Sequence, residues 1–469
     1  MFAAFSALSV RGRGATRLGA ATLVSGLAAA GALAGAGPAA AQEAAQGRAG
    51  ATATIGGLKT YGTAVLHGED GDRQLPAGLF EMSVEGGGTL QTYCVDLHNP
   101  TQKDARYHET PWSGTSLGAN RDAGRIRWIL QHSYPQVNDL AALAEKAGVR
   151  GALTEQDAAA GTQVAVWRYS DDADVEALDP QAEQLADYLE KSARDLPEPQ
   201  ASLTLEPPAV SGRPGERLGP VTVRTNARGV TVSPPADAAT SGVRIVDATG
   251  RTVTSAENGS RVFFEVPQDA AAGTAELTVQ ASTTVPVGRA FAAEGRSQTQ
   301  ILAGSSESTV SAAAGAAWAA KGAIPALSAA KNCPGGGVDI TATNAGDQPF
   351  TFELAGTGHT VAAGGSRTVT LPLREDQAYD FTIRGAGGFE QRFTGMLDCR
   401  TRAAEGGAAP QTLGEPSPAT VPGNAPSTNL AATGSSEATP LIAGTAIALV
   451  VLGGAALLVA RRRQTPPRH

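Results

Sequence analysis

The sequence predicts a multidomain protein: an α+β domain, two all-β units of immunoglobulin-like sandwich type, a stalk and a C-terminal transmembrane helix. Apolar residues recur at helical spacing only in the first part of the chain, and apolar/polar alternation dominates the middle. A single long apolar run lies near the C-terminus. The length of 469 residues agrees with about three domains.

Residues 54–195 combine strand-like and helix-like stretches. The strand-like ones come first, in "ATATIGGLKTYGTAVL" and "LFEMSVEGGGTLQTYCVDL". Three stretches with apolar spacing near 3.6 follow, "RIRWILQHSYP", "LTEQDAAAGTQVAVWRYS" and "QAEQLADYLEKSAR". Thr154 and Asp157 are spaced as in a capping box, so we expect the middle helix to begin there. These patterns predict one α+β domain.

The next two units are predicted to be all-β. Residues 200–305 alternate between apolar and polar residues, with Gly, Pro and Asn between the runs, which is typical of a β-sandwich. The stretch "STVSAAAGAAWAAKGAIPAL" is expected to connect this unit to the last one, residues 331–400. Cys333 opens that last unit and Cys399 closes it. A disulfide between them would stabilise the unit by about 4 kcal/mol and would leave Cys94 without a disulfide partner.

The N-terminus has the pattern of a signal peptide, residues 1–41. A basic stretch, "RGRGATR", precedes an Ala- and Gly-rich apolar run. Ala39 and Ala41 then occupy the small-residue positions of a cleavage site, so we expect cleavage after Ala41. Export would permit disulfides.

The C-terminus has the pattern of an anchor. Residues 401–429 are rich in Pro, Gly, Ser and Thr and predict an extended stalk. Residues 441–460 are apolar enough to cross a bilayer, and Arg461–Arg463 would remain in the cytoplasm. Just before this run stands the pentapeptide "LAATG", formed by Leu430, Ala431, Ala432, Thr433 and Gly434.

Together these features resemble the LAxTG sorting signals of actinobacterial sortase substrates, residues 430–469 here. The resemblance implies cleavage between Thr433 and Gly434 and transfer of Thr433 to peptidoglycan. The protein would lie briefly in the plasma membrane and then on the cell wall surface. A plain single-pass membrane protein is the alternative.

Composition and motifs limit the other functions. The net charge of −8 argues against a nucleic-acid partner. The six histidines are scattered and no cysteine pair has metal-ligand spacing, so we expect no metal site. The glycine-rich stretches lack nucleotide-binding context, and we expect no cofactor.

Two residues of the first domain raise a chemical question. Cys94 lies in "LQTYCVDLHNPT", which is expected to be a strand with Cys94, Asp96 and His98 on one face and Tyr93 on the other. Gln163 is expected on the apolar face of the helix that contains Ala159, Val166 and Trp167.

The order "YCVDL" then "TQVAVW" resembles the TQXA-type thioester domains of Gram-positive surface proteins, over residues 54–195. The resemblance implies a thioester between the Cys94 sulfur and the Gln163 side-chain carbonyl, formed with loss of ammonia. It further suggests an environment for the bond made of Tyr93, Asp96, His98, Thr162 and Trp167. Tyr93 and Trp167 would shield the bond. Asp96 and His98 would tune it, bind its attacker, or only hydrogen-bond locally.

The sequence thus predicts a wall-anchored surface adhesin that acylates an amine on an unidentified surface protein or other amine-bearing ligand. It would make one bond per molecule and would not be a turnover enzyme. One alternative is a structural wall protein in which Cys94 is a free thiol or forms an intermolecular disulfide. Another is a secreted cysteine hydrolase that uses His67, His108 or His132 as base. His98 is excluded as base because four residues along a strand span about 13 Å.

Overall fold

The computed structural model describes residues 49–69, 71–385 and 389–399. The expected signal peptide, stalk, sorting motif and 441–460 helix lie outside these residues. Within the described ranges, no helix is both long and apolar enough to cross a bilayer.

The N-terminal domain is built on a single antiparallel sheet with the strand order β3-β4-β16-β15-β5-β2-β6. Because β2 also pairs with β3, six of these strands close into a ring, and β6 extends from the far end of β2. The strands are β2 (Thr52–Leu66), β3 (Arg73–Val84), β4 (Thr89–Cys94), β5 (Arg106–Thr110), β6 (Val175–Ala177), β15 (Ala290–Ala293) and β16 (Gln300–Ser305).

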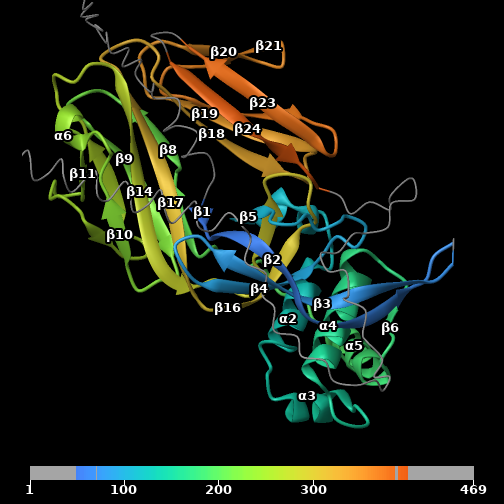
Figure 1. Cartoon of the computed structure of the whole chain (residues 1–469). Coiled ribbons are helices and arrows are strands. Elements are labelled where there is room, and N and C mark those ends of the chain that lie inside the picture. Colours follow the sequence, from blue (N-terminus) through green and yellow to red (C-terminus); the bar gives the residue numbers. More distant parts are fainter. Residues whose placement is uncertain (1–48, 70, 386–388, 400–469) are drawn as a thin grey trace, which may run out of the picture. The chain divides into compact units, whose positions relative to one another are not determined.

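Helices pack beside this sheet, as Figure 1 shows for α4 next to β3. They are α2 (Ala123–Gln131), α3 (Leu140–Ala147), α4 (Glu155–Ser170) and α5 (Pro180–Ser192), preceded by the short 3-10 helices η1 (Trp112–Gly114) and η2 (Ser116–Gly118). The expected capping box is present, since the Thr154 and Asp157 side chains each accept a hydrogen bond from the other residue's backbone N–H.

Helix α4 differs from the amphipathic helix expected from its sequence. Every residue from Ala158 to Trp167 is buried, because the helix packs between the sheet and α5. Gly161 allows the close approach of α5: a Cβ added there would lie 2.4 Å from the Ala182 carbonyl oxygen. Small residues on the second face therefore serve helix–helix packing, a role that periodicity alone does not reveal.

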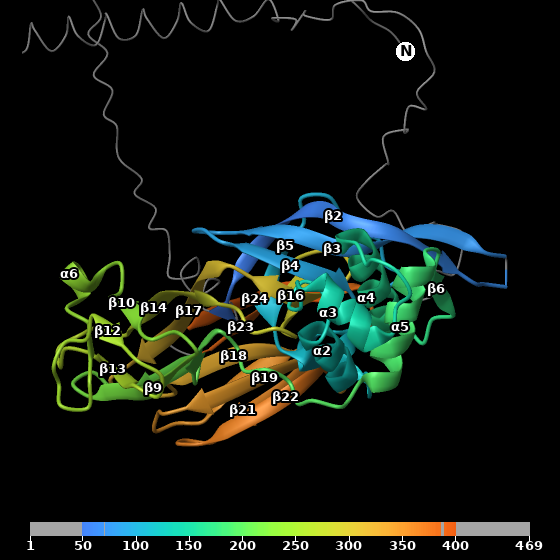
Figure 2. The same cartoon turned by 90° about the horizontal axis from the view of Figure 1, so that it is seen from below.

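The sandwich domain has two sheets (Figure 2). One has the order β11-β13-β9-β7, and the other β1-β17-β14-β10-β12, with β8 parallel to β17. Its elements are β1 (Ala49–Gly50), β7 (Leu203–Glu206), β8 (Ala209–Gly212), β9 (Arg217–Thr225), β10 (Val230–Ser233), α6 (Ala238–Ser241), β11 (Arg244–Val246), β12 (Ser255–Ala256), β13 (Arg261–Glu265), β14 (Gly273–Thr284) and β17 (Glu307–Trp318).

The boundaries of this domain differ from the expected 200–305 in two places. The stretch 290–305 forms β15 and β16 of the N-terminal sheet, so the sandwich is inserted into the N-terminal domain. The expected connection after residue 305 instead begins with β17, which pairs with β14 along its whole length. Its alanines give little strand signal, and their burial between neighbouring strands stabilises the strand.

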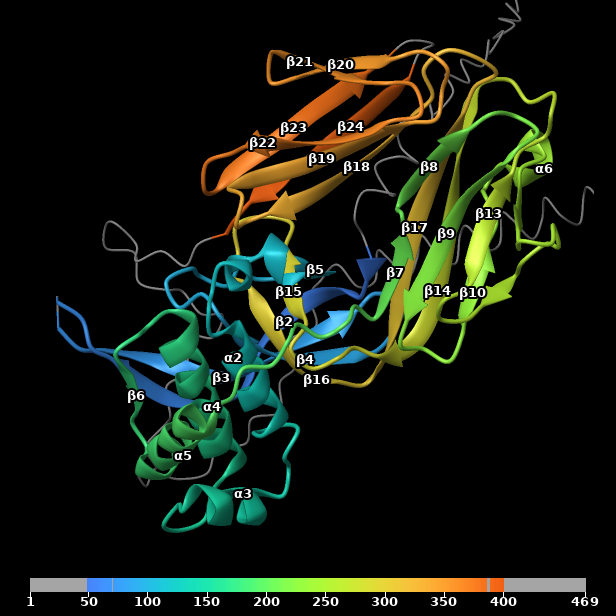
Figure 3. The ribbon, with the colours of Figure 1, turned by 180° about the vertical axis from the view of Figure 1, so that it is seen from behind.

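The C-terminal β domain contains the sheet β18-β19-β22 and two hairpins, visible in Figure 3. Its strands are β18 (Pro325–Asn332), β19 (Gly337–Asn344), β20 (Phe350–Leu354), β21 (Thr357–Val361), β22 (Ser366–Pro372), β23 (Gln377–Arg384) and β24 (Glu390–Leu397). The disulfide expected between Cys333 and Cys399 is present and joins the end of β18 to the end of β24, with a Cα–Cα distance of 5.3 Å.

Candidate functional site

Cys94 is the last residue of β4 and is a buried free thiol, with 1% of the residue exposed. The strand expected to continue through His98 stops here, and residues 95–99 form a bend and a turn. The Val95 backbone N–H still donates a hydrogen bond to the Thr299 backbone carbonyl (3.2 Å). The expected alternation of side chains beyond Cys94 is therefore wrong, because the ladder to β16 ends at this point.

Gln163 projects from α4 onto Cys94 and is fully buried. Its Oε1 accepts a hydrogen bond from the Cys94 backbone N–H (3.0 Å), and its Nε2 donates to the Cys94 backbone carbonyl (2.9 Å). The amide thus takes the place of a neighbouring strand at the end of β4. The two residues of the predicted thioester meet although 69 positions separate them.

A second glutamine, Gln300, contacts the sulfur itself. It is the cross-strand partner of Cys94 on β16, and its Nε2 lies 3.4 Å from the Cys94 Sγ. Thr92 donates to the Gln300 Oε1 (2.9 Å) and so orients the amide. Gln300 was not among the residues expected at the site, since 206 positions separate it from Cys94 and its stretch was expected in the sandwich.

Two carboxyl groups flank the turn after Cys94, that of Asp96 buried and that of Asp171 half-buried. Asp96 accepts hydrogen bonds from Ser116 Oγ (2.8 Å) and from the Thr299 backbone N–H (2.7 Å). Asp171, which caps the C-terminus of α4, accepts from the Leu97 backbone N–H (3.0 Å). Asp171 was not among the residues expected at the site.

Burial controls the protonation of this cluster. It raises the pKa of the Cys94 thiol well above its usual range, and nearby Asp96 adds to that rise, while the Gln300 hydrogen bond opposes it. Burial raises the pKa of Asp96, and burial followed by the Asp96 charge raises the pKa of Asp171 to about 8. The thiol is therefore neutral at physiological pH, and Asp171 can hold a proton there.

The remaining expected residues are dispersed around the site. Tyr93 is buried and donates its hydroxyl to the Tyr134 carbonyl (2.8 Å), on the face of β4 opposite the Cys94 side chain. Thr162 is buried and donates to the Ala158 carbonyl (2.7 Å). Trp167 is buried, and its Nε1 has no hydrogen-bond partner among the described residues.

His98, the last of the expected set, is half-buried in the turn after β4. Burial lowers its pKa, and the charge of Arg73 adds to the effect. His98 is therefore a neutral imidazole at physiological pH.

The histidines considered for a cysteine hydrolase have other contacts. His67 pairs with Asp72 (2.8 Å), and the His132 ring stacks on Trp128 at 3.9 Å. His108 lies on β5 and contacts Glu294 (2.6 Å). These contacts do not favour a thiol–imidazole pair at Cys94.

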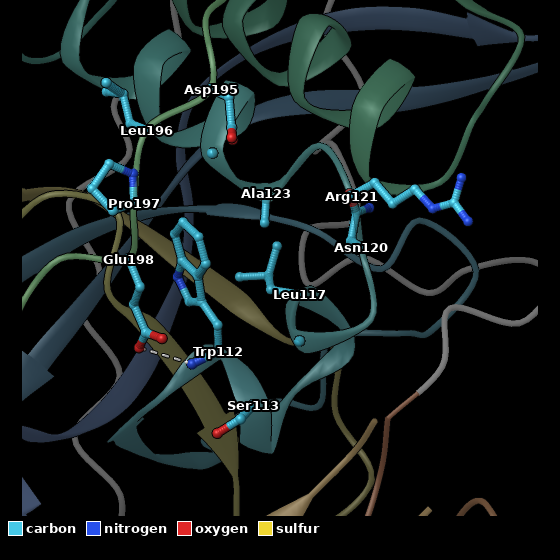
Figure 4. A pocket seen from close by; sticks show the side chains of 12 residues that line it. Trp112, Ser113, Leu117, Asn120, Arg121, Ala123, Asp195, Leu196, Pro197 and Glu198 are labelled. Atoms are coloured by element: carbon cyan, nitrogen blue, oxygen red, sulfur yellow. Dashed lines mark hydrogen bonds between the residues drawn. The ribbon is translucent and has the colours of Figure 1, made fainter. Parts of the chain in front are cut away.

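A pocket of about 380 Å³ (Figure 4) opens beside Trp112 of η1, whose backbone N–H donates to Glu198 (3.0 Å).

Three carboxyl groups lie close together in the C-terminal β domain. They belong to Glu375, Asp376 and Asp398, and their oxygens lie within 4.8 Å of one another. Burial raises the pKa of Asp398 to about 7.

Comparison with known families gives two matches. The model of the thioester domain family matches residues 91–195, and that of the bacterial phospholipase C C-terminal domain matches residues 310–396. No curated protein matches this sequence.

Several solved structures show distant likeness, and three of them are described below. The Bacillus anthracis TIE protein is 16% identical, with 74% of this chain and 64% of that chain covered and a TM-score of 0.27. This chain therefore spans less than two thirds of that protein. The thioester domain of the Enterococcus faecium TIE86 protein is 16% identical, with coverages of 58% and 96% and a TM-score of 0.27. The E. coli chaperone DraB is 14% identical, with coverages of 41% and 96% and a TM-score of 0.18.

The TM-scores of all three structures are low, so the assignment of the domain rests on the match to the family model. Both Cys94 and Gln163 fall inside the matched range, and the fold brings them into contact. Residues 91–195 therefore belong to a thioester domain.

Proposed function

We propose that Cys94 forms an internal thioester with one of the two buried glutamines that contact it, Gln163 or Gln300, and that this protein is a surface adhesin that uses the bond to attach covalently to an amine on a partner. The observation that supports this most strongly is the position of the two amides: that of Gln300 lies 3.4 Å from the Cys94 sulfur, and that of Gln163 is hydrogen-bonded to the Cys94 backbone. A bond between a thiol and an amide requires such positioning, because an amide is a poor electrophile.

The same contacts suggest how the bond forms. The Cys94 sulfur attacks the side-chain carbonyl carbon of the glutamine, and the carbonyl oxygen becomes negatively charged. An oxyanion donor is already in place for either residue: the Thr92 hydroxyl, 2.9 Å from the Gln300 oxygen, or the Cys94 backbone N–H, 3.0 Å from the Gln163 oxygen. The carbon–nitrogen bond then breaks, and the amide nitrogen leaves with the thiol proton as ammonia.

Burial preserves the product. Cys94 is 1% exposed and both glutamines are fully buried, so water has little access to the thioester. An amine that enters on local opening attacks the same carbonyl carbon and releases Cys94 as a thiol. The partner is then joined to the glutamine by an amide bond, and a hydroxyl attacker would give an ester. Each molecule reacts once, so the protein is a single-use binder and not an enzyme.

Sequence patterns near both ends of the chain support a location for this chemistry at the cell surface. The signal peptide pattern of residues 1–41 directs secretion, and the LAATG motif with its apolar run directs sortase attachment of Thr433 to peptidoglycan. The protein would lie in the plasma membrane until that transfer. The sandwich and C-terminal β domains would then hold the thioester domain away from the wall. The partner is a surface protein or another ligand with an accessible amine.

Intact mass of the freshly purified full chain tests the thioester. We expect a mass one ammonia below that calculated for the processed chain with its disulfide. Cys94→Ala should abolish the deficit. Methylamine should add at the glutamine whose carbonyl forms the thioester, and peptide mapping with the variants Gln163→Ala and Gln300→Ala identifies which of the two it is. Gln136→Ala is the control, since Gln136 is an exposed glutamine whose Nε2 donates to the Ala303 carbonyl (2.8 Å). A full mass in the parent chain would leave a structural wall protein with a free Cys94 thiol.

A further inference from the structure

A preformed pocket opens on the N-terminal domain between η1, the start of α2 and the segment after α5 (Figure 4). Its volume of about 380 Å³ lies in the range of about 300–1,000 Å³ that is typical of ligand pockets. Two hydrogen bonds fix its central residue, Trp112: the backbone N–H donates to Glu198 (3.0 Å), and the indole Nε1 donates to the Gly288 carbonyl (2.9 Å). The half-buried indole therefore presents a fixed aromatic surface to the pocket.

The charged groups around this pocket leave one carboxylate available. Asp195 is exposed, points toward the pocket in Figure 4, and has no hydrogen-bond or ion-pair partner among the described residues. Gly124 leaves room for it, since a Cβ added there would overlap the Asp195 carboxylate. Glu198 already pairs with Arg289 (2.7 Å), and the Arg121 side chain points away from the pocket. A free carboxylate next to an indole favours a cationic ligand.

The rest of the lining does not suit a neutral polar ligand such as a sugar. The Asn120 amide is already engaged at both ends: its Nδ2 donates to the Tyr169 and Ser170 carbonyls (2.9 and 3.1 Å), and its Oδ1 accepts from the Asp122 backbone N–H (2.7 Å). Leu117 adds an apolar wall beside the indole. An alkyl stem with a charged head matches this combination of apolar walls and one carboxylate.

We propose that this pocket binds an arginine side chain of the partner, and that this contact holds a neighbouring lysine amine of the partner close to the Cys94 thioester. Arginine fits better than lysine because the planar guanidinium stacks on an indole while it donates to a carboxylate. Guanidinium is always charged and does not attack a thioester. The placement of the lysine rests on the proposed function, whereas the binding of arginine does not.

The pocket and the Cys94 site share one stretch of chain. Leu117 lines the pocket, and its neighbour Ser116 donates its hydroxyl to Asp96 (2.8 Å), two residues after Cys94. A partner bound in the pocket therefore presents its neighbouring residues near the thioester. Such tethering raises the effective concentration of the amine at the site.

The first experiment measures binding without the thioester reaction. The full chain is treated with methylamine, which consumes any thioester, and is then titrated by calorimetry with Nα-acetyl-arginine amide. The neutral Nα-acetyl-citrulline amide and the cationic Nα-acetyl-Nε-dimethyl-lysine amide are titrated for comparison. Asp195→Asn removes the charge at constant shape, and Trp112→Leu removes the aromatic surface. Asp104→Asn is the matched control, since Asp104 is an exposed aspartate of the same domain outside the pocket lining.

We expect the arginine probe to bind with a Kd of about 1 mM and the citrulline probe about tenfold more weakly. Asp195→Asn should weaken arginine binding about tenfold, as for the loss of a hydrogen bond between charged groups. Trp112→Leu should weaken it about fivefold, as for a lost cation–π contact, and Asp104→Asn should match the parent. Thermal melting checks that each variant is folded.

Two results would overturn this binding site. Equal affinities for the arginine and citrulline probes would show that no charge is recognised, and an unchanged affinity in folded Asp195→Asn would place the charge elsewhere. Equal affinity for the dimethyl-lysine probe would overturn the preference for guanidinium.

The second experiment measures how fast lysine peptides add to the untreated full chain. Each peptide carries one lysine and one arginine, separated by glycine runs of increasing length, and each has a version with citrulline in place of arginine. We expect one spacing at which the arginine peptide reacts about tenfold faster than its citrulline version, in line with the difference in binding. Asp195→Asn should remove this advantage, and Asp104→Asn should keep it.

The outcomes separate this inference from the proposed function. A parent chain without the ammonia deficit overturns the thioester and the placement of the lysine, while calorimetry still decides whether the pocket binds arginine. A chain with the deficit that binds no arginine overturns the pocket alone. A chain that binds arginine, but reacts equally fast with both versions of the peptide at every spacing, overturns the link between the pocket and the thioester.

Discussion

The buried ion pair between Glu109 and Arg289 offers a sharp test of how the inserted domain is held. Glu109 lies on β5, and its carboxylate accepts hydrogen bonds from Arg289 Nε (2.9 Å), the Ser202 backbone N–H (2.9 Å) and the Ala51 backbone N–H (3.1 Å). Ser202 lies where the chain leaves for the sandwich, and Arg289 where it returns. The pair therefore holds both crossings together.

The cost of breaking this pair follows from its burial. The Glu109 side chain is fully buried and that of Arg289 is 5% exposed. Arg289→Met would leave the Glu109 carboxylate without its cation, and such an uncompensated buried charge costs about 3–5 kcal/mol. Glu109→Gln should cost less, because Arg289 keeps its ion pair with Glu198 (2.7 Å). The double variant should cost less than the sum of the two, because it leaves neither charge unpaired.

Urea unfolding of the full chain measures these differences in free energy. The control is Arg106→Met on the same strand, whose partner Glu85 is 50% exposed and whose own side chain is 37% exposed. A pair so exposed is worth about 1 kcal/mol or less. A loss below about 1 kcal/mol for Arg289→Met, equal to that of the control, would refute the reasoning from burial.

Three further predictions concern single features. Asp171 is protonated at neutral pH in the folded state and ionised in the unfolded one, so its contribution to stability falls as pH rises from about 4 toward its folded pKa of about 8. Asp171→Asn should therefore flatten the loss of stability over that window in urea titrations, and an unchanged slope would contradict this. Gly161→Ala should push α5 away at Ala182 and lower the melting temperature, whereas Gly148→Ala, which has open space, should show only the smaller cost of its left-handed backbone. Replacing both Cys333 and Cys399 by serine should lower the stability of the C-terminal β domain by about 4 kcal/mol while the ammonia deficit remains. Calorimetry measures the stability and intact mass measures the deficit; an unchanged stability or a lost deficit would contradict the prediction.

Much of the candidate site could be predicted because its signals are local. The spacing of Thr154 and Asp157 marked the start of α4, and the TQVAVW motif pointed to Gln163 on that helix. The strand character around Cys94 was also readable, up to the residue where the strand ends. Each of these features depends on residues within a few positions of one another.

The sequence by itself predicted a thioester domain with Cys94, the helix that presents Gln163, and the cysteines whose positions suggested a disulfide. Only the tertiary structure decided that the chain leaves the N-terminal domain, builds a sandwich and returns with Gln300 beside the Cys94 sulfur. It also decided that α4 is buried on all sides and that the turn after β4 brings Asp171 to the site. The reason is physical: periodicity records which face of an element is buried, whereas the partner of a strand depends on contacts between residues far apart in the chain.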